Sequence, residues 1–177
     1  MSEFRVVSSE FRNPKLYMVI ILGDPKKPKK RYESPKKVWD LERISTESKL
    51  IRQYGLKSSR ELWTFATRVK KFRRYARELL PLGEDGVEKA KPMIARLVKF
   101  GILTEQTLDG ILSLTTSDLL DRRLQSLVFK KGFAKSIAHA RQLITHGAVT
   151  IKGRRITVPG YLVSVDEEPA VAARVSA

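Results

Sequence analysis

The sequence predicts an α+β fold, in which a mostly helical N-terminal lobe precedes a helix–turn–helix and β-hairpin module with a small antiparallel sheet. Two observations predict it. From about residue 40 to residue 147, apolar side chains recur with the 3.6-residue period of amphipathic helices. Beyond residue 147 the period falls to two, which is typical of strands. We therefore expect four segments in the 177 residues: a leader and extended basic arm over 1–37, a helical lobe over 38–114, the module over 115–170 and a flexible tail over 171–177.

The segment before the first helix carries no clear period. Either Met18, which precedes a short apolar run, is the true start, or the residues around it form an ordered N-terminal arm; both alternatives stay open. Basic runs follow over 26–31 and 35–37, and the interspersed Pro28 and Pro35 exclude a packed helix or a central strand. We interpret these runs as an extended arm that orders on a phosphate backbone, rather than as a solvated linker.

Four helical segments are expected in the lobe. The first ends at Gly55, which suits the left-handed position after a helix, and its apolar stripe consists of Leu41, Ile44, Ile51 and Tyr54. The longest opens at Ser58, where Glu61 fits a capping box, and ends before Pro81. The other two cover residues 92–100, after a break at Gly83-Glu84-Asp85-Gly86, and residues 108–112.

The module is predicted to begin near Thr115. One helix carries Leu120, Leu124, Leu127 and Val128 and closes at Gly132, and a second runs from an N-cap at Ser136 to Gly147. A hairpin follows, with strands over 148–151 and 154–158 joined by Lys152-Gly153. A third strand is expected over 161–165, and the apolar tail after Pro169 is expected to fray.

The composition limits which binding partners and which classes of protein are possible. The chain has 35 Lys and Arg against 19 Asp and Glu, a net charge of +16 and a sequence pI near 10.2. An excess of this size is normally kept because a polyanion neutralises it. Apolar residues at 42% exclude a disordered basic tail, and the absence of cysteine excludes disulfides, thiolate catalysis and cysteine-ligated zinc. No apolar run reaches the roughly 18–20 residues of a membrane span, so we expect a soluble, cytoplasmic protein that binds nucleic acid rather than a membrane.

Motifs that carry catalysis or cofactor binding are not found in the sequence. It contains no phosphate-binding loop, no dinucleotide fingerprint and no His-Glu-x-x-His. The Gly83–Gly86 segment has an acidic centre that would repel phosphates. His139 and His146 are separated by two helical turns, roughly 10 Å, which is too far to share a metal. We therefore predict no catalytic residues, no cofactor and no metal.

A basic surface is predicted instead. Residues 122–165 contain no Asp or Glu, although an ordinary solvated surface mixes both signs. Lys135, His139, Gln142 and His146 share one arc of the second module helix, where all four can donate to phosphates and 2′-hydroxyls. On the long helix, basic residues point away from the apolar stripe. The predicted RNA-binding residues are Lys26, Lys27, Lys29, Lys30, Arg31, Lys70, Lys71, Arg74, Arg77, Arg122, Arg123, Lys130, Lys131, Lys135, His139, Gln142, His146, Lys152, Arg154 and Arg155.

Two sets of motifs resemble the family of small-subunit ribosomal protein four. The first resembles its RNA-binding module and consists of Arg122-Arg123-Leu124-Gln125-Ser126-Leu127-Val128, Lys131-Gly132, Ala140-Arg141-Gln142-Leu143-Ile144, His146-Gly147, Gly153-Arg154-Arg155 and Tyr161-Leu162-Val163. The second resembles the archaeal and eukaryotic branch and consists of Gly23-Asp24-Pro25-Lys26, Trp39-Asp40, Arg52-Gln53-Tyr54-Gly55-Leu56, Glu61-Leu62-Trp63 and Phe72-Arg73-Arg74. The shorter tail favours the archaeal type.

The resemblance implies a structural constituent of the small ribosomal subunit that binds its RNA early and nucleates assembly. It also implies a place near messenger RNA where it enters the subunit, beside small-subunit proteins three and five, and an influence on decoding accuracy. Some bacterial relatives carry a zinc knuckle, which this cysteine-free chain cannot form.

Three alternatives remain. One is a free-standing quality-control factor that carries the same module and binds stalled large subunits. An RNA-modifying enzyme would need a catalytic domain that about 100 helical residues without a cofactor loop do not supply. A chromatin-like DNA binder fits the charge but not the family motifs.

Overall fold

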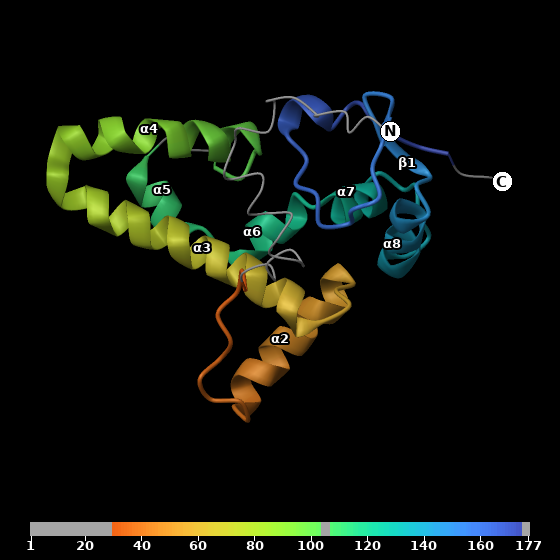
Figure 1. Cartoon of the computed structure of the whole chain (residues 1–177), viewed down its shortest axis with the longest axis horizontal. Helices are drawn as coiled ribbons and strands as arrows, with labels where there is room; N and C mark the ends of the chain where they lie inside the picture. The colour runs from red at the N-terminus through yellow and green to blue at the C-terminus, as the bar shows by residue number, and fades with distance from the viewer. Residues whose placement is uncertain (1–29, 104–106, 175–177) are drawn as a thin grey trace, which may run out of the picture. The chain divides into compact units, whose positions relative to one another are not determined.

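Helices and a small sheet follow one another as the α+β prediction requires. The computed structural model describes residues 30–103 and 107–174. Its elements, in chain order, are α2 (Leu41–Tyr54), α3 (Ser59–Leu79), the 3₁₀-helix η1 (Leu80–Leu82), α4 (Gly83–Lys99), α5 (Leu108–Ser113), α6 (Thr116–Asp121), α7 (Leu124–Lys130), α8 (Ile137–Thr145), β1 (Val149–Ile151), β2 (Arg154–Arg155), the 3₁₀-helix η2 (Val165–Glu167) and β3 (Val171–Ala173) (Figure 1). None of the described helices is both long and apolar enough to cross a membrane.

Helix α2 begins and ends where the sequence predicts. The Asp40 side chain accepts a hydrogen bond from the backbone N–H of Arg43, and Gly55 takes the left-handed conformation at φ +57°. Its predicted apolar stripe is only partly used, because Leu41 is 82% exposed while Tyr54 is buried. The helix is therefore held chiefly through its C-terminal end, where it contacts α3.

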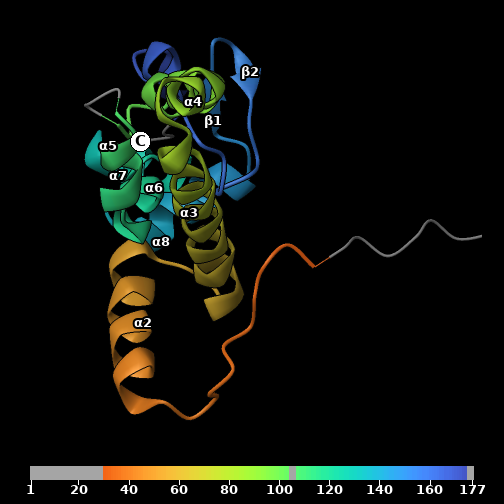
Figure 2. The same ribbon diagram turned by 90° about the vertical axis from the view of Figure 1, so that its left-hand side faces the viewer.

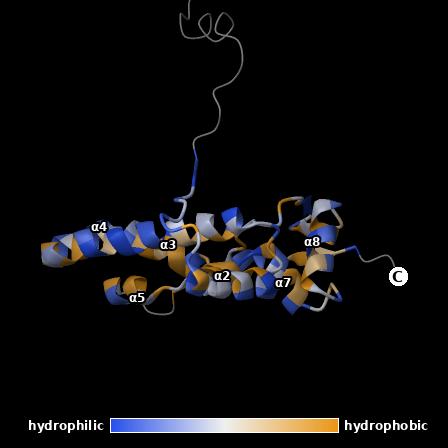
Figure 3. Cartoon of the chain, turned by 90° about the horizontal axis from the view of Figure 1, so that it is seen from below, coloured by the Kyte–Doolittle hydropathy of each residue, from blue (hydrophilic) through white to orange (hydrophobic). Residues whose placement is uncertain are grey.

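Helices α3 and α4 are joined by η1 and contact each other, and in Figure 1 they diverge from that turn with α5 between them. Figure 2 shows the same region turned by 90°. Helix α4 starts at Gly83, nine residues before the predicted start at Pro92. The expected break is confined to Gly83, which ends η1 at φ +58°, and does not extend to Gly86. Gly86 is instead a packing residue of α4, since a Cβ there would lie 2.1 Å from the backbone oxygen of Leu79. Hydrophilic and hydrophobic residues alternate along α3 and α4 in Figure 3, as expected for amphipathic helices.

Two hydrophobic clusters lie on either side of the junction between α6 and α7. The first, the lobe core, gathers buried residues from Tyr54 to Leu120, and the second, the module core, gathers buried residues from Leu124 to Val171. The prediction of one continuous helix through this junction is wrong. The backbone at 122–124 leaves helical geometry because it pairs with 161–163 instead.

The sheet has the order β2-β1-β3, with both pairs antiparallel. The predicted hairpin is confirmed, and its turn residues Lys152 and Gly153 take φ of +49° and +78°. The third strand was expected over 161–165, which forms only an isolated bridge, at Leu162. It is formed by β3, in the segment expected to be a flexible tail, because Val171 is 4% exposed and packs into the module core.

Candidate nucleic-acid interface

Four RNA-contact residues were predicted on α8 and at its two ends, and three of them are exposed. Lys135, Gln142 and His146 are exposed, and His139 is half-buried. On the opposite side Ala140 and Ile144 are fully buried in the module core, which fixes the orientation of the helix. The Ser136 side chain accepts from the backbone N–H of His139 at 3.1 Å and sets the start of the helix.

The hairpin extends this basic face. Lys152, Arg154 and Arg155 are all exposed. One of them is also a structural tie, since Nη2 of Arg155 donates to the backbone oxygen of His146 at 2.8 Å. Its guanidinium lies so close to Gly147 that a Cβ there would come within 1.7 Å of the Nε atom. The end of α8 and the hairpin therefore form one surface, with Arg154 uncommitted among the described residues.

Two predicted contact residues lie inward instead. Arg123 is 2% exposed, so it cannot reach a ligand in this fold, and the expectation that it contributes to the basic surface is wrong. Arg122 is half-buried and donates to Oε2 of Glu168 at 2.9 Å. Lys131 also donates to the backbone oxygen of Glu168. The acidic partners, Glu61 and Glu168, lie outside the acid-free stretch, so a charge pattern along the chain could not pair them.

Glu61 joins the lobe to the module. Its carboxylate accepts from Nη2 of Arg123 at 3.1 Å and from Nη1 and Nη2 of Arg141 at 3.2 and 2.7 Å. This use of the side chain explains why the predicted capping box is wrong: Ser58 makes no side-chain cap. Burial raises the pKa of Glu61, but the hydrogen bonds and positive charges of the two arginines outweigh it, so the net pKa is lowered. Burial lowers the pKa of Arg123, against the opposing effect of Glu61.

A second buried contact reinforces this junction. The fully buried Gln125 on α7 donates through Nε2 to the backbone oxygens of Gly55 and Ile137, at 3.1 and 3.0 Å. A Cβ on Gly55 would lie 2.1 Å from Cγ2 of Ile137, so only glycine permits this approach. The turn between α2 and α3 is therefore fixed directly against α7 and α8. Sequence reasoning missed Glu61, Gln125 and Arg141 because their partners are more than 60 residues away along the chain, or lie on another helix.

The basic face of α3 is partly neutralised. Lys70, Lys71, Arg74 and Arg77 are exposed, as predicted. Lys70 pairs with Glu33 at 2.5 Å, and Arg74 pairs with Glu78 at 2.9 Å. The hydrogen bond and charge of Lys70 lower the pKa of Glu33. Such exposed pairs are weak and exchange readily for a phosphate partner. Lys130 is likewise exposed and pairs with Asp121 at 3.0 Å.

The end of the predicted basic arm docks on α3. Residues 30–40 form neither helix nor strand, and Lys30 and Arg31 are exposed. The backbone N–H of Glu33 donates to Oγ1 of Thr67 at 3.0 Å, and the rings of Tyr32 and Trp63 lie 5.9 Å apart. Lys26, Lys27 and Lys29 lie outside the described residues.

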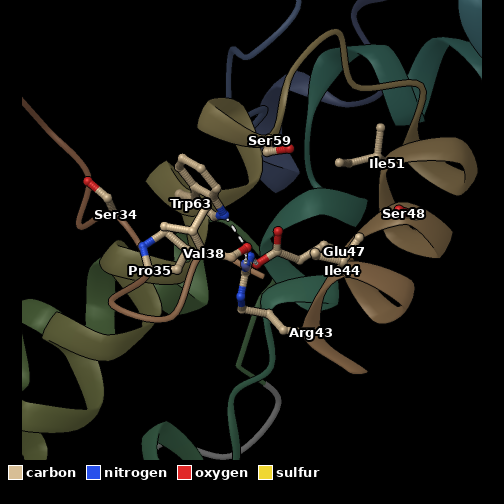
Figure 4. A pocket seen from close by; sticks show the side chains of 10 residues that line it. All are labelled: Ser34, Pro35, Val38, Arg43, Ile44, Glu47, Ser48, Ile51, Ser59 and Trp63. Atoms are coloured by element: carbon tan, nitrogen blue, oxygen red, sulfur yellow. Dashed lines mark hydrogen bonds and ion pairs between the residues drawn. The ribbon is translucent and has the colours of Figure 1, made fainter. Parts of the chain in front are cut away.

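A cavity of about 260 Å³ separates this segment from α2 (Figure 4). In the close-up the Trp63 indole points toward Glu47, and its Nε1 donates to that carboxylate at 3.1 Å. Glu47 also pairs with Arg43 at 2.8 Å, and Arg43 in turn donates to the backbone oxygens of Lys37 and Val38. Arg43, Glu47 and Trp63 thus connect the arm, α2 and α3 around this cavity.

Comparisons with known proteins decide the family. The S4 domain family matches residues 122–168, which contain α7, α8 and the hairpin. Over 152 residues the chain is 50% identical to small ribosomal subunit protein uS4 of Ignicoccus hospitalis, covering 85% of this chain and 92% of that protein. It is 49% identical to the uS4 protein of Hyperthermus butylicus, covering 85% and 86%, and 48% identical to that of Saccharolobus solfataricus, covering 83% of each.

The chain belongs to the uS4 family. The resemblance found in the sequence is therefore confirmed, including its archaeal character. The uS4 proteins it matches are ribosomal proteins, a structural and non-enzymatic class, in agreement with the predicted absence of catalysis. The S4 domain match begins at Arg122, where the backbone leaves α6 and pairs with the strand-like segment at 161–163.

Proposed function

We propose that this uS4 chain is a structural constituent of the small ribosomal subunit and binds the ribosomal RNA of that subunit directly, in the cytoplasm. The observation that carries the proposal is the exposed surface formed by α8 and the hairpin. It presents Lys135, Gln142, His146, Lys152 and Arg154, within a stretch of 44 residues, 122–165, that has no acidic side chain. Lys152 also interacts electrostatically with the carboxylate of Glu167, and the donors of the other four residues suit phosphate oxygens and 2′-hydroxyls.

Recognition in this proposal is by shape and backbone charge rather than by base sequence. An A-form helix offers its phosphates and its shallow minor groove to a rigid basic surface. Here two basic faces, on α3 and on the module, belong to elements joined by Glu61 and Gln125. Because the junction is formed before RNA arrives, little ordering cost is left for binding. This suits a protein that binds early and nucleates assembly.

The arm over 26–37 completes the proposed grip. Its basic residues would order along a phosphate backbone when the subunit assembles, as polar segments without apolar residues commonly do on binding. Its C-terminal end already docks on α3 through Glu33 and Thr67. The C-terminal end of the arm is therefore held on α3, and the proposal is that the remaining residues bind RNA from that point.

The neighbours proposed for this chain follow from the family resemblance. We infer a position beside small-subunit proteins three and five, near the channel through which messenger RNA enters. Contact with protein five would give the chain an influence on decoding accuracy. Chemical cross-linking of purified small subunits tests this, because cross-links to protein three or five are expected and their complete absence would remove the assignment.

Filter binding to a small-subunit ribosomal RNA transcript tests the central proposal. Affinity should fall steeply as salt rises, with a slope near −0.7 to −0.9 for each phosphate contacted. Arg154→Ala should weaken binding several-fold and reduce the slope by about one contact, without changing the unfolding midpoint. Lys49→Ala, which removes an exposed charge from α2, is the matched control and should change neither quantity by as much.

Two outcomes would contradict the proposal. Affinity that is flat in salt would exclude a phosphate-dominated interface. Co-sedimentation of the native protein with large subunits in a sucrose gradient, in place of small ones, would favour the quality-control alternative.

A further inference from the structure

A cavity of about 330 Å³ lies among α3, the C-terminal end of α4, α6 and the 161–163 segment of the module, and none of its lining residues belongs to α8 or the hairpin. Arg68 and Phe72 of α3 line one side, and Arg96 of α4 with Phe100 at its C-terminal end line the other. The buried Leu97 and Leu119 contribute apolar lining. This volume is at the lower end of the range, roughly 300–1,000 Å³, in which proteins hold small organic groups.

The same short pattern builds both walls. In each helix an arginine precedes a phenylalanine by four residues, as Arg68 with Phe72 and Arg96 with Phe100. Residues four apart lie on one face of a helix, one turn from each other. All four residues line the same cavity, so the two faces lie on either side of it. The cavity therefore offers a guanidinium and an aromatic ring from each side.

The half-buried Arg68 and the exposed Arg96 beside this cavity differ from several other arginines in having no acidic partner among the described residues. Arg43, Arg122 and Arg141 each pair with a glutamate. Among the described residues, Arg68 and Arg96 make no ion pair, and the half-buried Arg68 rests only on the ring of Phe65, at 5.4 Å. Burial lowers the pKa of Arg68, and the neighbouring charges of Arg31 and Arg96, both positive, lower it further.

A bound anion would supply the negative charge that Arg68 and Arg96 lack. Two like charges, those of Arg31 and Arg96, beside the half-buried guanidinium of Arg68 are unfavourable in the free protein, and a phosphate would offset that repulsion. Two flanking phenylalanines add a preference for a flat aromatic ring, and a phosphate next to such a ring is a nucleotide. A strand source is favoured because Lys71 lies one turn from Arg68 on α3 and Arg31 belongs to the basic arm.

We propose that this arginine–phenylalanine cavity binds one nucleotide of an unpaired RNA strand, with the phosphate on Arg68 and Arg96 and the base against Phe72 and Phe100. The inference rests on the proposed binding of ribosomal RNA and adds a second RNA contact on the helical lobe, distinct from the face of α8 and the hairpin. Its competing occupant is a segment of this chain outside the described residues.

The full-length chain with Arg96→Gln tests the phosphate contact. Affinity for the small-subunit RNA transcript should fall about tenfold, and the salt slope should decrease by about one contact. The thermal midpoint of the free protein should stay the same or rise, because one of three repelling charges is gone. Lys91→Gln is the matched control: it removes one charge from the same helix, on a different face and outside this cavity.

RNA affinity and the thermal midpoint, measured together, distinguish three possible results. If Arg96→Gln lowers the midpoint clearly more than Lys91→Gln, the arginines serve an internal partner and the proposal is overturned. If the wild-type chain binds the transcript tightly and Arg96→Gln binds equally well, the cavity is excluded while the proposed function stands. If the wild-type chain does not bind at all, the proposed function itself fails.

A second variant addresses the base. Phe100→Leu keeps an apolar side chain but removes one aromatic face, and should weaken binding roughly fivefold to tenfold with an unchanged salt slope. Ultraviolet cross-linking of a 4-thiouridine-substituted transcript should place an RNA adduct on a peptide that contains Phe72 or Phe100. Adducts confined to peptides of α8 and the hairpin would overturn the assignment.

Discussion

The α3–α4 pair and the C-terminal module are stabilised in different ways. Helices α3 and α4 have 21 and 17 residues, continuous apolar faces and a short connection, so local pattern and neighbouring helices account for them. The module is assembled from helices of seven and nine residues and strands of two or three. Elements of this length are marginal alone. The module therefore depends on contacts that are distant in sequence.

Those distant contacts are unusually polar. The 122–124 segment pairs its backbone with 161–163, Gln125 reaches Gly55, and Glu61 binds Arg123 and Arg141. Nη2 of Arg123 and Nε2 of Gln125 have partners in this network, whereas Nε and Nη1 of Arg123 and Oε1 of Gln125 have no hydrogen-bond partner among the described residues. Removing the remaining partner of a buried charge is costly. We therefore expect the protein to tolerate the loss of an exposed charge on α3 better than the loss of Glu61, which joins α3 to the module.

Among the variants considered, Glu61→Gln is expected to cause the largest loss of stability. It leaves Arg123, 2% exposed, without a charged partner, and should lower the free energy of unfolding by about 3 kcal/mol. Urea denaturation followed by circular dichroism measures the change. Glu78→Gln, which removes the exposed partner of Arg74 on the same helix, is the control and should cost no more than about 0.5 kcal/mol. Equal losses in the two variants would show that the junction depends no more on charge than an exposed surface pair.

Gly55→Ala should have the next largest effect, through geometry alone. Its φ of +57° disfavours a side chain, and the new Cβ would meet Ile137 at 2.1 Å. The two penalties together should cost about 2–3 kcal/mol. Gly132→Ala is the matched control, since its φ is +76° but no atom lies within 4 Å of the added Cβ, so only about 1 kcal/mol is expected. If both variants lose the same stability, the backbone conformation and not the close contact decides.

The predictable part of the fold follows the same division. Helix α2 with its stop at Gly55, the Ser136 cap of α8 and the Lys152-Gly153 turn were predicted, because each depends on residues within a few positions. The break at 122–124, the location of the third strand in β3 and the early start of α4 at Gly83 were not. Each depends on a partner that the local pattern does not contain.

The candidate site divides in the same way. Exposure of Lys135, Gln142 and Arg154 followed from helical and strand periods. The burial of Arg123 did not, because the stretch 122–165 around it contains no acidic residue and its carboxylate partner, Glu61, lies on α3. Basic residues that serve RNA and those that serve the fold look alike in sequence, and only the location of their acidic partners separates them.

Acid should weaken the junction of the wild-type chain more than that of the Glu61→Gln variant, which has no carboxylate to protonate at this position. The folded-state pKa of Glu61 is below its ordinary value of 4.5, so the unfolded chain binds more protons in acid. The stability due to its ionisation is therefore fully present above pH 4.5 and is lost as pH falls through the folded-state pKa. Between pH 5 and pH 3 the thermal midpoint of the wild-type chain should fall about 2–4 °C more than that of the variant.

Glu167→Gln, in the module, is the control for the acid-dependent fall of the thermal midpoint, the smallest of these effects. The pKa of Glu167 is also lowered: burial raises it, but hydrogen bonds from Ser164 and Tyr161 outweigh burial. Glu167→Gln should therefore retain the acid-dependent loss due to Glu61, while Glu61→Gln should retain the one due to Glu167. If the pH profile of Glu61→Gln runs parallel to that of the wild-type chain, water rather than Arg123 and Arg141 solvates the carboxylate. The module would then be held to α3 by Gln125, Gly55 and apolar packing without a contribution from charge.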